Sequence, residues 1–192
     1  MSQDEPSSGL DLHKAAGLVG AYCAIERRMF EVTGAMATEE GLPPEIRLFA
    51  DAMSSQHAWH AELWADRLPV TAALDPAALV TLPPPVGEIL AVVADRRQLE
   101  GLVGLFRVVL PRLIVSYSRH ASHALPATDG PTVRALTLVI RDEKDELLGG
   151  ESLVERVLGT PEAVQLAGRV VVDLEARLVQ AGIVPGLVPW PA

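Results

Sequence analysis

Aromatic residues are scarce in this chain: Phe, Trp and Tyr together make up 4% of the 192 residues, whereas hydrophobic residues as a whole make up 49%. A core built from Leu, Val, Ala and Ile favours packed helices over an aromatic-rich sheet. The only cysteine, Cys23, excludes an intramolecular disulfide and is expected to be a small buried packing residue. The composition therefore predicts an all-α protein.

Long apolar runs and concentrated positive charge are also missing. No stretch approaches the roughly 18 to 20 apolar residues that a membrane span needs, and the N-terminus has neither the basic start nor the apolar run of a signal peptide. The formal net charge of -9 argues against nucleic acid as the main partner, because a phosphate backbone requires a basic face. These absences predict a cytoplasmic protein that acts on neither nucleic acid nor a membrane.

The first half of the chain has the pattern of two packed helices. Residues 11 to 182 are predicted to form one domain, between a flexible polar arm at residues 1 to 10 and a proline-rich tail at residues 183 to 192. Apolar residues recur in steps of three and four from Leu18 to Met36 and again from Ile46 to Trp64. The short connection "EEGLPPE" makes these two helices antiparallel neighbours.

The second half begins with a long connection. Residues 68 to 85 contain many prolines and no sustained period, and a third helix is predicted from 86 to 125, kinked or shifted in its packing at Pro111. A fourth helix starts near Thr132, and a fifth runs to about Ala181. The predicted N-caps of the first and last helices are Asp11 and Thr160.

Ionisable residues lie on the predicted buried faces of three helices. Glu26 lies beside the apolar stripe of the first helix, where a carboxylate needs a charged partner or a metal. His57 and His60 are three residues apart in "SSQHAWHAELW", and Glu143 and Glu146 repeat that spacing in "RDEKDEL". Counting residues from the turns puts the three helices' groups at one depth, so we expect a single layer of candidate metal ligands.

This order of residues resembles the ligand plan of the ferritin-like di-iron carboxylate bundles. In that plan a Glu on the first helix is followed by a Glu-x-x-His pair on the second, a Glu on the third and another Glu-x-x-His pair on the fourth. The resemblance covers roughly residues 11 to 158. It implies a four-helix bundle with a long crossover between helices 2 and 3, to which this chain adds a C-terminal fifth helix. Within that plan His57 replaces a Glu, Glu146 replaces a His, and residues 109 to 113 of the third helix offer only Arg112 as a charged group.

The altered ligand set leaves two readings open. The negative charge of three carboxylates exceeds the positive charge of one divalent ion and falls short of that of two. A single metal ion is therefore the simpler occupant. His57 and His60 with one glutamate would suit non-haem iron with open positions, and manganese or zinc accepts similar ligands. Such a site could serve an oxidoreductase or hydroxylase that acts on a small-molecule substrate.

In the alternative reading no metal is bound. An inward Arg112 paired with a carboxylate of the layer would satisfy the site by buried ion pairs and leave a structural, binding or assembly module. An outward Arg112 leaves room for an ion. The residues assigned to the surroundings or pocket of the site are Tyr22, Arg112, Tyr117 and His120.

The apolar tail also has two alternative roles. Leu187, Val188 and Trp190 could either cover the bundle or form the contact of a homodimer. The sequence does not separate these roles.

Overall fold

The structure, a computed structural model, describes residues 10–71, 73–96 and 98–191, without the side chains of residues 126–128. The described residues form helices and no strand, apart from one isolated bridge between Thr71 and Leu74. In chain order the elements are α1 (Leu12–Ala37), α2 (Pro44–Ala65), α3 (Pro76–Leu79), α4 (Pro84–Asp95), α5 (Gln98–Gly104), the π-helix η1 (Leu105–Val109), α6 (Leu110–His123), α7 (Pro126–Val157) and α8 (Pro161–Gln180). The all-α prediction is confirmed.

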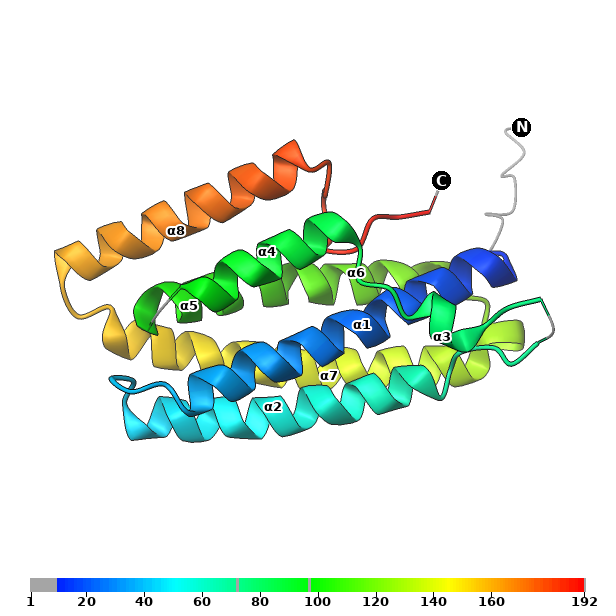
Figure 1. Cartoon of the computed structure of the whole chain (residues 1–192), viewed down its shortest axis with the longest axis horizontal. Coiled ribbons are helices and arrows are strands. Elements are labelled where there is room, and N and C mark those ends of the chain that lie inside the picture. The colour runs from blue at the N-terminus through cyan, green and yellow to red at the C-terminus, as the bar shows by residue number, and fades with distance from the viewer. Residues whose placement is uncertain (1–9, 72, 97, 192) are drawn as a thin grey trace, which may run out of the picture.

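Four long helical segments lie side by side: α1, α2, α7 and the continuous run of α5, η1 and α6 (Figure 1). α2 and α6 run in one direction, and α1 and α7 run in the opposite direction. α4 lies against α1, and α8 lies against α4 and α5. Together α4 and α8 cover one side of the long helices. The candidate site lies among the four long helices.

The ends of the helices follow from local sequence chemistry. The Asp11 carboxylate accepts a hydrogen bond from the backbone N–H of Lys14 at 2.8 Å, and the Thr160 hydroxyl accepts one from Ala163 at 3.2 Å. Both predicted N-caps are therefore confirmed. Prolines occupy the start of α2, α4, α7 and α8, where a missing N–H costs no helical hydrogen bond.

The continuous third helix predicted from 86 to 125 is wrong. The chain reverses between α4 and α5, where Gln98 has a left-handed φ of 49° and its backbone N–H donates to the Glu39 carboxylate at 3.1 Å. Arg96 binds Asp173 of α8 at 2.6 Å. These contacts with distant segments hold the corner, and the apolar pattern on either side of it gives no local sign of them.

Pro111 lies inside a helical segment that continues from α5 through α6. The turn before it is the π-helix η1, in which the Leu110 N–H bonds to the Leu105 carbonyl, five residues back. A proline ring clashes with the carbonyl four residues back in a regular α-helix, and the wider π turn relieves that clash. The change in the helix that was predicted at Pro111 is this π turn, and the helical segment continues beyond it.

Two other helix boundaries differ from the sequence-based expectation. The connection at 68 to 85 includes the short helix α3, and its last residues already belong to α4. α7 begins at Pro126 and not near Thr132, although Asp129 interrupts it with non-helical dihedral angles. The predicted arm at residues 1 to 10 lies outside the described residues except for Leu10.

The C-terminal tail packs on α6. The backbone N–H groups of Leu187 and Val188 donate to the Ser116 hydroxyl at 2.8 and 3.0 Å. Ile183 and Leu187 are buried. The tail thus covers this helix, which is one of its two predicted roles.

The core is mostly aliphatic, as the composition predicts. Its largest buried side chains also include four aromatic residues, which are Trp64, Tyr22, Tyr117 and Phe106. No helix in the described ranges is both long enough and apolar enough to cross a membrane.

Candidate metal centre

The site begins with the register between α1 and α2. The Ser54 hydroxyl donates to the Phe30 carbonyl at 3.0 Å, and the Cys23 thiol donates to the Ala61 carbonyl at 3.3 Å. Between these two contacts the antiparallel register places Glu26 opposite His57. Cys23 is a buried packing residue, as the sequence suggests.

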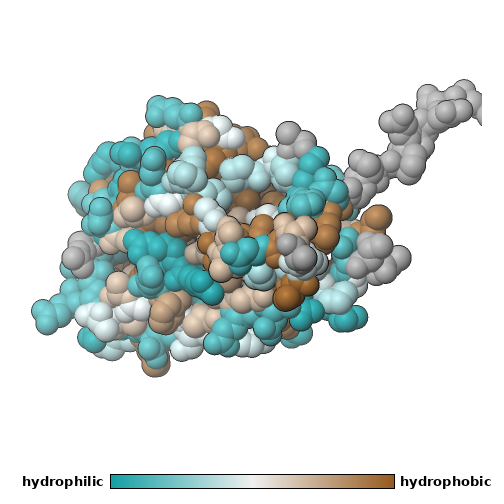
Figure 2. All heavy atoms as spheres, turned by 45° about the vertical axis from the view of Figure 1, so that its right-hand side comes forward, coloured by the Kyte–Doolittle hydropathy of each residue, from teal (hydrophilic) through white to brown (hydrophobic). Residues whose placement is uncertain are grey.

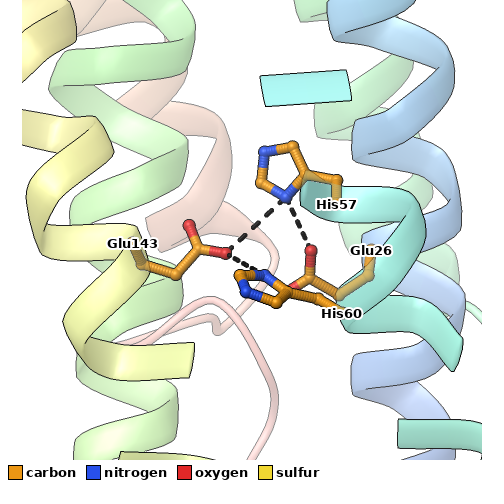
Figure 3. A group of neighbouring side chains, drawn as sticks. All are labelled: Glu26, His57, His60 and Glu143. Carbon is orange, nitrogen blue, oxygen red and sulfur yellow. Dashed lines mark hydrogen bonds and ion pairs between the residues drawn. The ribbon is translucent and has the colours of Figure 1, made fainter. Parts of the chain in front are cut away.

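Glu26 and the two histidines converge in the interior (Figure 3). His57 Nδ1 lies 2.6 Å from Glu26 Oε2, and His60 Nδ1 lies 3.7 Å from Glu26 Oε1. All three side chains have no exposed surface. The i, i+3 spacing on α2 therefore aims both imidazoles at one carboxylate of α1.

Glu143 closes the group from α7. Its Oε1 lies 3.2 Å from His60 Nδ1 and 3.6 Å from His57 Nδ1. One ligand atom from each of Glu26, His57, His60 and Glu143 lies within 4.8 Å of all the others. The predicted layer exists for these four residues, which we call the Glu–His cluster.

Glu146 lies at the edge of the Glu–His cluster. Its Oε2 is 3.5 Å from His57 Nε2, on the opposite side of the imidazole from Glu26. The sequence analysis missed Asp142, whose Oδ2 lies 3.3 Å from His60 Nε2 and whose side chain is 23% exposed. Asp142 is next to Glu143 in "RDEKDEL". It lies at the outer edge of the buried helix face, so the helical period alone does not predict its contact with His60.

Tyr117 fills the position where the third helix was expected to lack a ligand. Its hydroxyl donates a short hydrogen bond to Glu26 Oε1. The expected register, with residues 109 to 113 near Glu143, agrees with the contacts of Phe106 with Gly150 and of Arg107 with Glu151. The long Tyr117 side chain leans back toward the N-terminus of α6 and so reaches this depth. Tyr22 packs against Tyr117 with ring centroids 4.7 Å apart, and its hydroxyl donates to the Ser116 carbonyl at 3.3 Å.

Two residues assigned to the surroundings of the site lie away from it. Arg112 binds Glu175 of α8 through both carboxylate oxygens and donates to the Ile183 and Pro185 carbonyls. It points to α8 and the tail, so it does not pair with the carboxylates of the layer. His120 is buried next to Tyr22, with ring centroids 5.7 Å apart.

At three groups of the cluster, neighbouring opposite charges shift the pKa more than burial does. Burial raises the pKa of Glu26, but His57 and His60 outweigh this effect and lower it to about 2. Burial lowers the pKa of both imidazoles, but the carboxylates of Glu143 and Glu26 raise it to about 9 for His57 and about 11 for His60. In the metal-free protein both histidines are therefore cations near neutral pH.

Burial dominates at the other two glutamates. It raises the pKa of Glu146 to about 8, and burial together with the charge of Glu26 raises the pKa of Glu143. Several atoms here lack a hydrogen-bond partner among the described residues: His57 Nε2, Glu143 Oε2 and both Glu146 oxygens. A buried polar atom without a partner costs about 1–3 kcal/mol, so their concentration in one layer indicates a place for a ligand.

The donor set fits a divalent transition metal. Two imidazole nitrogens and two carboxylates are ligands that iron, manganese and zinc accept. Tyr117 and Asp142 hydrogen bond to ligand residues from outside, which is how metal sites hold their ligands in place. The residue types present therefore fit a divalent ion.

Comparisons of this chain with protein-family models, with curated proteins and with solved structures gave no match.

Proposed function

We propose that this chain is a ferritin-like metal protein that holds one divalent ion in the Glu–His cluster and serves an oxidoreductase or hydroxylase activity on a small molecule. The observation that carries the proposal is the burial of Glu26, His57, His60 and Glu143 with ligand atoms within 4.8 Å of one another. Carboxylates and imidazoles are rarely buried together unless they pair or bind a metal.

The path of the chain supports the ferritin-like part of the proposal. α1 and α2 form an antiparallel pair, α6 and α7 form another, and α2 and α6 run in the same direction (Figure 1). Two antiparallel pairs related in this way need a connection that returns along the whole length of the bundle. α4 makes this return, so the crossover is helical and longer than the connection predicted at 68 to 85.

Iron is the ion we favour, with manganese or zinc as alternatives. Two histidines with carboxylates leave positions open for dioxygen or substrate, and iron or manganese bound there would supply redox chemistry. Arg112 supports an ion indirectly, because its guanidinium is bound to Glu175 and so adds no positive charge to the cluster.

The chain's own residues would control protons and water at this site. Tyr117 keeps its proton, because burial raises its pKa well above the ordinary value. Its hydroxyl therefore stays a hydrogen-bond donor to Glu26. Glu146, with a pKa of about 8, holds a proton beside His57 near neutral pH. The buried rings of Tyr22, Trp64 and Tyr117 exclude water from one end of the cluster.

A metal-free module is the second candidate, and one observation favours it. The 2.6 Å contact of His57 with Glu26 and the raised pKa of both histidines let protons balance the buried carboxylates without an ion. Such pairs can hold helices in register. The two candidates differ in whether metal displaces these protons.

Metal content decides between them. Protein without a histidine tag is loaded anaerobically with ferrous ion, desalted and measured by elemental mass spectrometry, with manganese and zinc in parallel. We compare the wild type with a His57→Gln, His60→Gln variant and with a matched control, His13→Gln, His123→Gln, which removes two histidines outside the cluster. Circular dichroism checks the fold of each protein.

We expect about one equivalent of metal in the wild type and the control, and none in the cluster variant. Metal that stays in a folded cluster variant would refute the assignment of the ligands. A wild type without metal would support the metal-free module.

A further inference from the structure

A second feature of the molecule lies outside the Glu–His cluster. A pocket of about 620 Å³ lies where the first turns of α1, the residues around α3 and the C-terminal tail meet. Its walls are mostly apolar, including Leu18, Ala21, Leu79 and Val188. This end of the molecule comes forward in Figure 2, where apolar residues are exposed among hydrophilic ones. The volume is in the range of small-molecule sites.

Two glycines of α1 shape the pocket in opposite ways. At Gly20 a Cβ would lie 2.0 Å from the Leu79 carbonyl oxygen, so this glycine lets the end of α3 rest directly on α1 and form a wall. At Gly17, which lines the pocket, a Cβ would meet no described atom within 4 Å. A mid-helix glycine costs roughly 0.5–1 kcal/mol relative to alanine. Because Gly17 has no side chain, it leaves this part of the pocket open, and a larger side chain there would fill it.

The opposite wall is held in place by aromatic and polar contacts. The Trp190 ring lies 4.8 Å from the His123 ring, and the Arg119 guanidinium lies 4.3 Å above it. The Ser116 hydroxyl fixes the backbone just before Trp190. The tail therefore forms a defined wall of the pocket.

The charged groups around the pocket are basic. His13 and Lys14 line it and are exposed, so their polar ends lie at its rim. No Asp or Glu is among the described lining residues, and the nearby Asp11 and Asp75 are engaged as caps of α1 and α3. The Lys14 ammonium is therefore the charge that an anionic ligand would meet at the rim.

We propose that this pocket binds a small amphiphilic carboxylate, with its apolar chain over Gly17 and Leu18 and its carboxylate beside Lys14 and His13. The apolar walls bury the chain. The ammonium of Lys14 attracts the anion. This binding needs no metal in the Glu–His cluster, so it stands or falls independently of the proposed function.

Isothermal titration of the metal-free full-length protein with decanoate, below its micelle-forming concentration, tests the proposal. Decyltrimethylammonium has the same chain with the opposite charge. A Gly17→Leu variant fills the pocket from a position where the new side chain meets open space. Gly168→Leu on α8 is its matched control, since a Cβ there also meets nothing within 4 Å among the described atoms. Lys14→Gln removes the rim charge.

We expect one decanoate per chain, bound at least about tenfold more tightly than the cationic amphiphile, a difference of about 1.4 kcal/mol. Gly17→Leu should weaken binding by at least about tenfold, Lys14→Gln should weaken it measurably, and Gly168→Leu should leave it unchanged. Three results would overturn the proposal: no saturable binding, equal binding of both amphiphiles, or full binding by Gly17→Leu. Binding that appears only after removal of residues 1–9 would also overturn it, because the chain's own arm would then be the occupant.

Discussion

The buried imidazole of His120 makes the stability of this protein depend on pH. Burial lowers the pKa of His120 from 6.5 to about 4, with Asp129 raising it and His123 lowering it by smaller amounts. Its Nδ1 has no hydrogen-bond partner among the described residues, and its ring lies between Tyr22 and Trp190. The folded state therefore holds this imidazole neutral.

The sign and size of the effect follow from proton linkage. Between pH 6.5 and pH 4 the unfolded chain binds a proton at His120 that the folded chain does not, so its contribution to stability is present above pH 6.5 and is lost as the pH falls. At pH 5 this loss amounts to about 2 kcal/mol relative to pH 8. It approaches about 3 kcal/mol below pH 4.

A comparison with a His120→Phe variant isolates this contribution from the other titrating groups. Urea unfolding of both proteins at pH 8, 7, 6 and 5, with chelator present, gives the free energy of unfolding at each pH. The wild type should lose about 2 kcal/mol more than the variant between pH 8 and pH 5. Parallel curves, within about 0.5 kcal/mol, would show that His120 titrates normally in the folded state and would refute the reasoning.

Three further predictions concern packing and the site. Gly150→Ala should destabilise the protein by about 2 kcal/mol or more, because the new Cβ would lie 2.1 Å from the Phe106 ring. As a control in the same urea assay, Gly168→Ala places its Cβ in open space and should stabilise the protein by up to about 1 kcal/mol. Tyr117→Phe removes a hydrogen bond to a buried carboxylate and should cost about 2 kcal/mol, and unchanged stability would contradict that bond. Deletion of residues 183–192 should cost at least about 4 kcal/mol through the three buried aliphatic side chains of Ile183, Leu187 and Val188. A changed mass in light scattering would instead support the homodimer contact.

Local chemistry in the sequence predicted much of the fold. The caps at Asp11 and Thr160 depend on neighbours within three residues, so they can be read directly. The inward direction of His57 and His60 follows from the helical period of α2. Glu26 opposite His57 follows from one short turn, because a short connection leaves little freedom in the register of two helices.

The parts that sequence reasoning missed depend on contacts between distant segments. The corner before Gln98 is held by Glu39, which lies 59 residues earlier in the chain. The contact of Tyr117 with Glu26 depends on how far this long side chain reaches back along its helix, which counting residues from the turn does not show. The direction of Arg112 was set by α8 and the tail, which no local pattern connects to it.

X-ray absorption at the metal edge of the iron-loaded protein tests the central claim most directly, because it identifies the atoms around the ion. The account predicts a first shell of nitrogen and oxygen ligands with the outer-shell scattering of two imidazoles per ion, both lost in the His57→Gln, His60→Gln variant. A spectrum with oxygen ligands only, unchanged in that variant, would show that the ion is bound elsewhere and would contradict a metal centre at the Glu–His cluster.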